Sequence, residues 1–367
     1  MNWKLAHASV RGSAHVRSGR PNQDAAQCVV IPGEGNIPTV TVAAVSDGHG
    51  GARHFRSQTG SALAVSASVD VMLEFFSDTS GTGRQSIDSA RFADLEKSLV
   101  DNWLAAVSSD LENRPLTEEE LHNLEARKGA QSRLAVENEP VLAYGATLLV
   151  AAATESLMVL LQLGDGEILC VSNDGQTTRP MPDDPRLSGS ETTSLCEPEA
   201  WREFRSAWLA APEWPALVLL ATDGYPNSFR SADDFVRIGA QYLGMIRDRG
   251  IENVTGELPQ ILSEASHHGS GDDITLAILQ GEFEKSLVDE NPTVADRAVS
   301  SGVPSEKITH ERMNPADSLP QTSGEGMVPF GKPRAGNLTL RLIILLLVLA
   351  VVGMSVYFLR GRFHLPS

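Results

Sequence analysis

The stretch Val45-Ser46-Asp47-Gly48-His49-Gly50-Gly51 decides how the rest of this sequence is interpreted. The residues before it, 39–45, are largely apolar and indicate a buried strand. The strand ends on a carboxylate, and the glycines that follow let the backbone approach a ligand closely. An Asp-Gly pair is also the commonest kind of turn, so a plain turn is the alternative for this stretch taken alone.

The same arrangement recurs along the chain. Further acidic turns adjoin apolar runs of strand length: Pro21-Asn22-Gln23-Asp24 before 25–31, Gly164-Asp165-Gly166 after 157–163, Thr222-Asp223-Gly224 after 216–221, and Gly271-Asp272-Asp273 before 274–279. Carboxylates gathered at one end of a sheet repel each other and need cations to be stable together. Oxygen ligands favour Mg²⁺ or Mn²⁺ over zinc, and the sequence has no Cys/His set with zinc spacing.

Six short motifs resemble, in order, those of the metal-dependent protein phosphatases of the 2C type. They are Asn22-Gln23-Asp24-Ala25, Asp47-Gly48-His49-Gly50-Gly51, Gly145-Ala146-Thr147-Leu148, Gly164-Asp165-Gly166, Thr222-Asp223-Gly224 and Gly271-Asp272-Asp273-Ile274-Thr275. Each is short, but six in order over residues 8–282 are hard to explain otherwise. The resemblance implies an α+β fold, a four-layer αββα sandwich of two antiparallel sheets flanked by helix pairs.

The resemblance also implies a reaction, the hydrolysis of phosphoserine and phosphothreonine in proteins by a water that two Mn²⁺ or Mg²⁺ ions activate. Asp47, with the backbone carbonyl of Gly48, would bridge the ions, and Asp223 and Asp272 would complete the ligand set. Asp273 is the less favoured of the adjacent acidic pair. Such ions lie about 3.5–4 Å apart and share a water that attacks phosphorus in line, without a phosphoenzyme.

Two further carboxylates match family positions around the metals. Asp24 and Asp165 resemble residues that support the metals through water or bind a third, weaker ion, and either alternatively caps a turn. By the same resemblance His49 is the general acid that protonates the leaving serine alkoxide, the alternative being a histidine that bonds a loop carbonyl. Asp47 and His49 are therefore the expected catalytic pair.

The family places an arginine shortly before the first acidic turn, where it holds the substrate phosphate. A planar guanidinium suits this task because it binds two oxygens at once. Arg17 and Arg20 both lie near the expected place, and the spacing does not decide between them. Either is otherwise a solvated surface charge. Gln23 departs from relatives that carry an acid at that position.

The amino-acid composition limits which partners and which cellular compartment are expected for this chain. The chain has 367 residues, 41% of them apolar, enough for one large domain with additions. A net charge of −17 argues against a nucleic-acid partner, because no basic surface is available in bulk to neutralise phosphates. Three cysteines without a CxxC pair, together with an N-terminus that lacks an apolar signal segment, indicate a reducing compartment.

The C-terminal region predicts a membrane anchor. Residues 342–359 form an apolar run about as long as a bilayer core, with basic residues on both sides. The expected organisation is a catalytic domain at 1–283, a disordered linker at 284–337, a transmembrane helix at 338–360 and a short tail at 361–367. This predicts a single-pass, tail-anchored protein whose domain lies in the cytoplasm; a buried core helix is the alternative.

Apolar periodicity predicts the remaining elements. Strands are expected at 3–10, 144–154, 157–163 and 167–173, and helices at 55–75, 87–111, 201–209, 232–249 and 251–268. Residues 11–23 are expected to form a polar loop, and 114–140 a surface insertion in which Thr117 caps a helix. The segment 177–199 matches a variable family flap that helps to choose substrates, or is a plain loop.

The expected partners are phosphorylated proteins, a serine/threonine kinase that produces them, and the membrane. Two other functions stay open. One is a non-catalytic, membrane-tethered domain that binds phosphoproteins as a scaffold, which a missing ligand would favour. The other is a metal-dependent hydrolase of small phosphoesters, which deep pocket contacts would favour.

Overall fold

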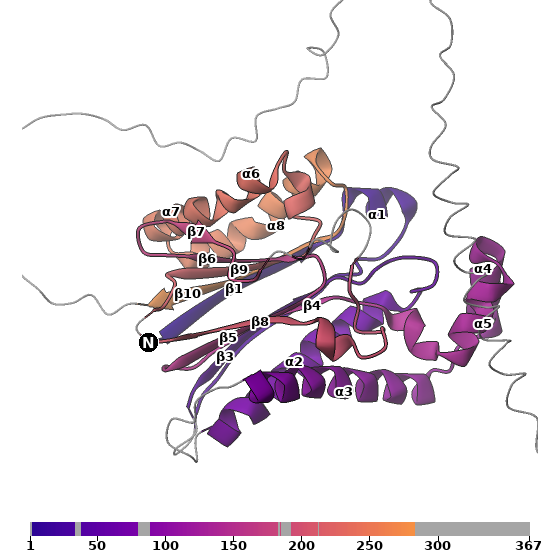
Figure 1. Ribbon diagram of the computed structural model, residues 1–367. Helices are drawn as coiled ribbons and strands as arrows, with labels where there is room; N and C mark the ends of the chain where they lie inside the picture. Colours follow the sequence, from indigo (N-terminus) through magenta and orange to yellow (C-terminus); the bar gives the residue numbers. More distant parts are fainter. Residues whose placement is uncertain are drawn as a thin grey trace, which may run out of the picture. The chain divides into compact units, whose positions relative to one another are not determined.

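The computed structural model describes residues 2–33, 38–79, 89–182, 184, 192–211 and 213–282 (Figure 1). The chain divides into two compact units, Met1–Ser301 and Gly302–Ser367, and every described residue belongs to the first. The predicted linker at 284–337, membrane helix at 338–360 and tail at 361–367 therefore lie outside the described residues.

Ten strands in the described ranges form two antiparallel sheets of five. One sheet has the order β1 (Asn2–Val10), β10 (Ile274–Glu282), β9 (Leu217–Ala221), β6 (Glu167–Val171) and β7 (Thr177–Thr178). The other has the order β2 (Ala25–Ile31), β3 (Val40–Ser46), β4 (Leu148–Ala153), β5 (Leu157–Leu163) and β8 (Arg205–Ala210). The chain crosses between the sheets at the turn from β5 to β6, which contains Asp165.

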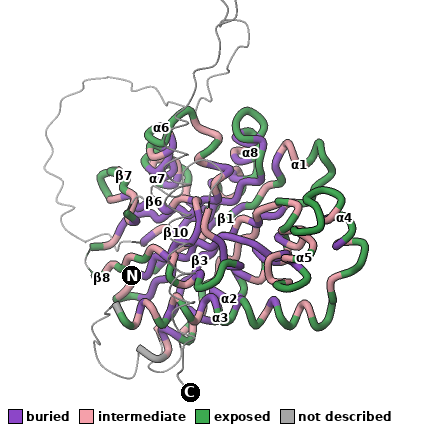
Figure 2. The backbone as a smooth tube through the Cα atoms, turned by 45° about the vertical axis from the view of Figure 1, so that its right-hand side comes forward, coloured by how far each residue is buried: buried purple, intermediate pink, exposed green. Residues whose placement is uncertain are grey.

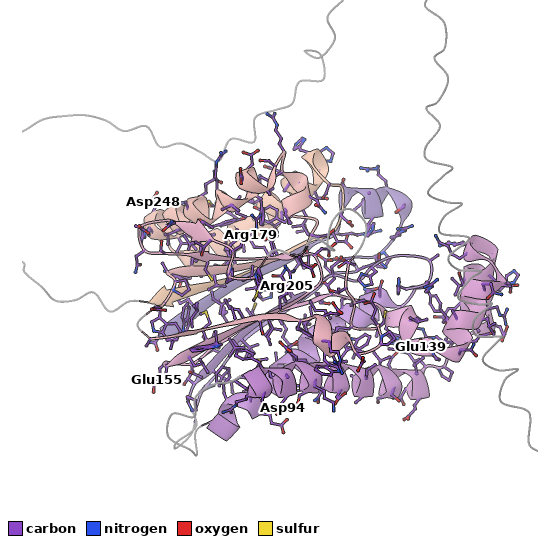
Figure 3. All side chains as sticks on the ribbon, in the orientation of Figure 1. Asp94, Glu139, Glu155, Arg179, Arg205 and Asp248 are labelled. Atoms are coloured by element: carbon purple, nitrogen blue, oxygen red, sulfur yellow. The ribbon has the colours of Figure 1, made fainter. Side chains whose placement is uncertain are left out.

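Three apolar clusters separate four layers. Helices α2 (Ser57–Thr79) and α3 (Ser89–Asn113) pack on the β3 sheet, and α7 (Ile238–Arg249) and α8 (Ile251–His268) pack on the β1 sheet. The third cluster, which includes Val45 and Leu220, fills the space between the sheets. Figure 2 shows the central strands buried, and Figure 3 shows charged side chains such as Asp94 and Asp248 on the outer helices. The predicted αββα sandwich is confirmed.

Helix α2 lies unusually close to the chain that enters β4. A Cβ atom at Gly60 would lie 1.8 Å from the carbonyl oxygen of Tyr144, so only glycine fits there. Trp103 of α3 donates a hydrogen bond to the Gly60 carbonyl at 3.0 Å. Within the described part of the chain, Ser57–Ser77 is the one helical segment long and apolar enough to span a membrane. Because 61% of its apolar window is buried in the fold, it is typical of a core helix.

The predicted insertion is a pair of helices, α4 (Glu118–Lys128) and α5 (Ala130–Asn138), followed by a 3₁₀ turn at Pro140–Tyr144. The predicted cap is confirmed, because the Thr117 side chain accepts from the backbone of Glu120 and the Glu120 carboxylate accepts from the backbone of Thr117. In Figure 1 this pair lies beyond the end of α3, outside the four layers of the sandwich.

Three local predictions were wrong. The expected helix at 201–209 is a 3₁₀ turn, Ala200–Glu203, followed by edge strand β8. The side chains of β8 alternate between half-buried and exposed, and the short apolar pattern of this segment fits such a strand as well as a helix. The expected helix at 232–249 breaks at Arg237 into α6 (Ala232–Val236) and α7. The expected loop at 11–23 contains the short helix α1 (Ser13–Ser18). A further 3₁₀ turn, Pro226–Ser228, follows β9.

The strand register brings the acidic turns to one end of the sandwich. Val10 pairs with Ile274, and Ala25 pairs with Ser46. The ends of β5 and β9 and the start of β6 lie at the same level, since Glu167 pairs with Ala221. Antiparallel pairing thus places the beginning of one strand beside the end of the next, and the turn residues of both meet there.

Candidate active site

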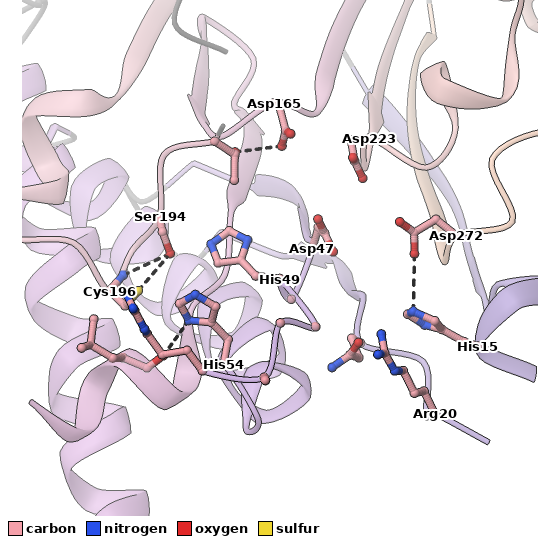
Figure 4. A pocket seen from close by; sticks show the side chains of 18 of the residues that line it. His15, Arg20, Asp47, His49, His54, Asp165, Ser194, Cys196, Asp223 and Asp272 are labelled. Atoms are coloured by element: carbon pink, nitrogen blue, oxygen red, sulfur yellow. Dashed lines mark hydrogen bonds and ion pairs between the residues drawn. The ribbon is translucent and has the colours of Figure 1, made fainter. Parts of the chain in front are cut away.

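A cavity of about 1050 Å³ opens at the end of the sandwich where the acidic turns meet. Asp47, Asp165, Asp223 and Asp272 direct their carboxylates toward the same space (Figure 4). His15 and Arg20 lie at one edge of this space, and His49 and His54 lie at the other. Four turns that are far apart in sequence therefore contribute to a single acidic centre.

Backbone contacts with Thr147 fix Asp47 at the end of β3. The backbone amide of Asp47 donates to the Thr147 hydroxyl at 3.0 Å, and its carbonyl accepts from the Thr147 amide at 2.8 Å. Gly48 forms an isolated bridge with Ala146 and must be glycine, because a Cβ atom there would lie 2.7 Å from the Gln23 carbonyl oxygen. The turn is thus held rigidly with its carboxylate facing the cavity.

Three carboxylates from different turns lie close together. One ligand atom from each of Asp47, Asp165 and Asp223 lies within 4.8 Å of the other two. Asp165 accepts a hydrogen bond from the Thr192 hydroxyl at 2.9 Å, and Asp223 accepts one from the Asn227 amide at 3.0 Å. Each side chain keeps oxygen lone pairs free, as ligands of a hard cation require.

Asp24 lies buried behind this group. One of its carboxylate oxygens accepts from the Thr222 hydroxyl at 2.7 Å, while the other, Oδ1, is buried without a hydrogen-bond partner. A buried oxygen without a partner is costly unless something else binds it. The residues therefore fit divalent cations, which would satisfy both the carboxylate cluster and the Asp24 oxygen.

The raised pKa values of Asp24, Asp47 and Asp223 also indicate a site that binds cations. Burial, opposed by the Thr222 hydrogen bond and reinforced by the charge of Asp273, raises the pKa of Asp24 to about 7. Burial and then the charges of Asp165 and Asp272 raise the pKa of Asp223 to about 7. Burial and the charge of Asp24 hold the pKa of Asp47 well above its usual range. In the cation-free fold these groups resist ionisation.

The adjacent acids Asp272 and Asp273 differ in their surroundings. Asp273 is 3% exposed and accepts from the amides of Gly12 and Gln23 at 2.6 and 2.7 Å and from His15 Nδ1 at 2.8 Å. The Asp272 side chain is 53% exposed and lines the cavity, 3.7 Å from His15 Nε2. Asp273 thus joins α1 to the turn before β2, while Asp272 is free to bind a ligand.

The two candidate arginines, Arg17 and Arg20, differ in their position relative to the cavity. Arg20 lines the cavity and has no hydrogen-bond or ion-pair partner in the described part of the chain. Arg17 points along α1, donating to the Ser13 hydroxyl at 3.3 Å, and lies outside the cavity lining. Of the two, Arg20 is therefore the one placed to reach a ligand in the cavity.

His49 lies beside the carboxylates, and its Nε2 is buried without a hydrogen-bond partner. Burial, and next the charge of His54, lowers the pKa of His49 to about 3, so its ring is neutral near pH 7 in the cation-free fold. The ring of His54 packs edge-on against the ring of His49, with centroids 5.1 Å apart. His54 Nδ1 donates a hydrogen bond to the Leu142 carbonyl at 2.6 Å.

The fold brings together most of the residues that the sequence singled out. Asp47, Gly48, His49, Asp165, Asp223, Asp272 and Arg20 line one cavity, Asp24 lies buried behind it, and Arg17 lies outside. Sequence reasoning assigned no role to His15, Thr147 or Thr222, whose side chains orient the carboxylates. The two threonines belong to quoted motifs, but their contacts join residues about 100 to 200 positions apart.

The sequence of the chain matches one known protein family. The family model described as "Protein phosphatase 2C" matches residues 11–263. Similar solved structures include the S. agalactiae serine/threonine phosphatase, at 16% identity and a TM-score of 0.46, covering 77% of this chain and 100% of that one. The Mycobacterium tuberculosis phosphatase PstP/Ppp matches at 14% identity and a TM-score of 0.43, covering 77% and 100%.

A structure of the PstP catalytic domain in complex with two manganese ions matches at 15% identity and a TM-score of 0.41, covering 76% of this chain and 97% of that one. No curated protein sequence shows significant similarity to the chain. Because the family model spans more than half of the sequence, the chain belongs to the protein phosphatase 2C family. It is accordingly a hydrolase, a protein serine/threonine phosphatase. The protein phosphatase 2C family uses Mn²⁺ or Mg²⁺.

We predict that the cation-free protein loses stability as the pH rises from about 4 to 7, the window set by the ordinary and raised pKa values of Asp24 and Asp223. The native state binds more protons than the unfolded state there, so the free energy of unfolding falls with pH. Mn²⁺ at about 100 times its Kd should raise the Tm at pH 7.5 by about 5–10 °C.

Thermal melts in EDTA and in Mn²⁺ across this pH range measure both effects. Asp223→Asn should flatten the pH dependence and shrink the Mn²⁺ effect, while the exposed control Asp248→Asn should change neither. A Tm gain of the same size in Asp223→Asn would show that Mn²⁺ binds elsewhere.

Proposed function

We propose that this chain hydrolyses phosphoserine and phosphothreonine in proteins with two bound Mn²⁺ or Mg²⁺ ions. The observation that supports this most is the convergence of Asp47, Asp165 and Asp223 within 4.8 Å, above the unpartnered oxygen of Asp24. Protein ligands of this type, oxygen-only and partly open to an accessible cavity, suit hydrolytic metal chemistry.

Asp47, the Gly48 carbonyl, Asp223 and Asp272 would hold the two ions. Asp24 and Asp165 would support them through water, or hold a third ion with Asp223. When bound, the ions would lower the pKa of a water and neutralise charge on the phosphate oxygens. Thr147 and Thr222 keep the carboxylates in place, so little reorganisation would be needed during the reaction.

Arg20 would grip the phosphate from the edge of the cavity, because its guanidinium is exposed, lines the cavity and carries no partner within the described residues. His49, on the opposite edge, would give its proton to the departing serine or threonine oxygen. A phosphate dianion near the ring favours the protonated imidazole, which offsets the low pKa that burial imposes on His49.

The two other functions receive less support. A scaffold without catalysis would tolerate the loss of a carboxylate, yet every expected carboxylate is present at the centre or directly behind it. A hydrolase of small phosphoesters would use an enclosing pocket, whereas this cavity is wide, about 1050 Å³, and extends from the carboxylates to helix α4. An open site of this size suits a phosphorylated segment of a protein.

We also propose that residues 338–360 anchor the protein in a membrane, with 284–337 as a flexible tether and the catalytic domain in the cytoplasm. The support is the apolar run at 342–359 with basic residues on both sides. A tether would hold the domain at raised local concentration near phosphoproteins of the same membrane, including targets of a serine/threonine kinase.

Activity tests the main proposal. The full chain should release phosphate from a phosphothreonine peptide in Mn²⁺ or Mg²⁺, and EDTA should abolish the release. Asp223→Asn should lower kcat/KM by more than about 100-fold, because one ligand carboxylate is lost. Asp248→Asn is the matched control and should keep full activity. Absence of turnover with either metal in a folded chain would favour the scaffold.

The proton from His49 is tested with two leaving groups. His49→Ala should slow hydrolysis of the phosphothreonine peptide by roughly 10²- to 10⁴-fold, because its alkoxide needs a proton. The same variant should slow p-nitrophenyl phosphate much less, since nitrophenolate leaves without one. Equal slowing of both substrates would count against the general acid role.

Membrane attachment is tested by fractionation. We expect the full chain to sediment with membranes and to resist extraction by alkaline carbonate, because a spanning helix is not held by charge. A chain that ends at Asn337 should stay in the soluble fraction with its phosphatase activity intact. An insoluble, inactive truncated chain would mean that the apolar run belongs to the core of the domain.

A further inference from the structure

Four cations line the active-site cavity without any partner in the described part of the chain: Arg20, Arg53, Arg127 and Lys128. They gather at one place in a chain whose net charge is −17. Arginines elsewhere in the same region are engaged: Arg56 binds Glu120 at 2.8 Å, and Arg133 contacts Glu118, Glu125 and Glu137. Free cations have gathered where substrate must enter.

Arg127 and Lys128 come from helix α4, which is outside the αββα sandwich. Three of the four acidic side chains of α4 are engaged, because Glu118 and Glu125 bind Arg133 of α5, and Glu120 binds Arg56 of the main fold. These contacts hold α4 in place at the cavity. The fourth acidic side chain, Glu119, lies in the first turn of the helix, away from Arg127 and Lys128 in its last turn. The last turn of α4 therefore presents two positive charges that no neighbouring carboxylate neutralises within the described residues.

A smaller hollow of about 290 Å³ adjoins the cavity and continues along α4. It shares Arg20 and Arg127 with the main cavity and adds Phe55, Leu124 and Glu120, whose carboxylate is paired with Arg56. The two hollows connect the region of the proposed metals to α4, so a peptide whose phosphate lies beside Arg20 would run past Arg127.

We propose that Arg53, Arg127 and Lys128 bind acidic residues that flank the phosphorylated residue, so that the enzyme selects phosphoproteins with acidic sequences around the target site. The inference rests on the proposed phosphatase function and specifies its substrate class. Cations at a helix C-terminus also stabilise the helix dipole, which accounts for Arg127 and Lys128 in part. That effect does not account for Arg53, which reaches the same cavity from the loop before α2.

Local charge matters here because the chain as a whole, with a net charge of −17, repels an acidic peptide. Of the acidic residues that line the cavity, the aspartates would be neutralised by the bound cations, which leaves Glu197. A flank of acidic residues is attracted where the three cations lie, and Coulomb interactions of this kind are strongest at low salt. The contact exists before and during the reaction, so it should act on KM more than on kcat.

The test compares three phosphothreonine peptides that differ only in their flanks, which are glutamates, glutamines or lysines. For the full chain in Mn²⁺, kcat/KM should favour the glutamate peptide over the glutamine peptide by roughly 5- to 30-fold, mainly through KM. The ratio should shrink as salt rises from 0.1 M to 1 M, where the Debye length falls from about 10 Å to about 3 Å.

Variants assign the effect to residues. Arg127→Gln with Lys128→Gln should reduce the ratio to below roughly 3-fold. The control Lys97→Gln with Arg230→Gln changes two exposed cations outside both hollows and should keep the ratio. Charge reversal, Arg127→Glu with Lys128→Glu, should shift the preference toward the lysine peptide, a gain that unfolding of α4 cannot produce.

Equal kcat/KM for the three peptides in the unmodified chain would overturn the inference and leave the phosphatase function standing. A ratio that the α4 variants leave unchanged would also overturn it, because the selectivity would then come from other residues. Turnover of none of the peptides would instead count against the proposed function itself.

Discussion

The gathering of carboxylates at one end of the sandwich is the constraint on which this structure depends. Asp24 is buried, and Asp47 and Asp223 are half-buried at the cavity, so desolvation first and then neighbouring charge raise all three pKa values. These carboxylates do not stabilise the fold by themselves, because apolar residues of similar size in the same space would stabilise it more. The arrangement makes physical sense as a binding site for divalent cations, and the stiffness of the sandwich keeps the carboxylates together.

The surrounding contacts separate the acidic residues that hold the fold together from those whose carboxylates face the cavity. Asp273 uses its carboxylate to join α1, the turn before β2 and His15, and it is almost entirely buried. Its neighbour Asp272 keeps its side chain in the cavity. Thr147 and Thr222 use their hydroxyls to position Asp47 and Asp24. The acidic centre is therefore rigid on its protein side and open on its solvent side, as a site for a large substrate requires.

Charge is distributed unevenly around this centre. The chain as a whole is strongly acidic, yet free cations collect at the rim of the cavity, from the turn before β2, from the loop before α2 and from the added helix α4. The helices of the sandwich cover the sheets through apolar contact, and α4 and α5 bury Leu121, Leu124 and Val136 in the same cluster as α2 and α3. An ion pair from Glu120 to Arg56 adds to this attachment. The helix pair thus adds Arg127 and Lys128 to the rim of the cavity and supplies none of the carboxylates beneath it.

The sequence by itself determined the strand-and-turn pattern, the acidic turns and their family, because buried strands and glycine-rich turns leave strong local signals. It also determined the Thr117 cap, since a capping box is a contact over three residues. It could not distinguish strand from helix at 201–209, where a short apolar run fits both and pairing with β5 decides. Nor could spacing separate Arg17 from Arg20, and only the family resemblance favoured Asp272 over Asp273. The tertiary structure decided the strand at 205–210 and the position of Arg20, and it showed what Asp273 contacts. The direction of a side chain at a turn depends on contacts with residues hundreds of positions away, such as Asp273 with Gly12 and Gln23.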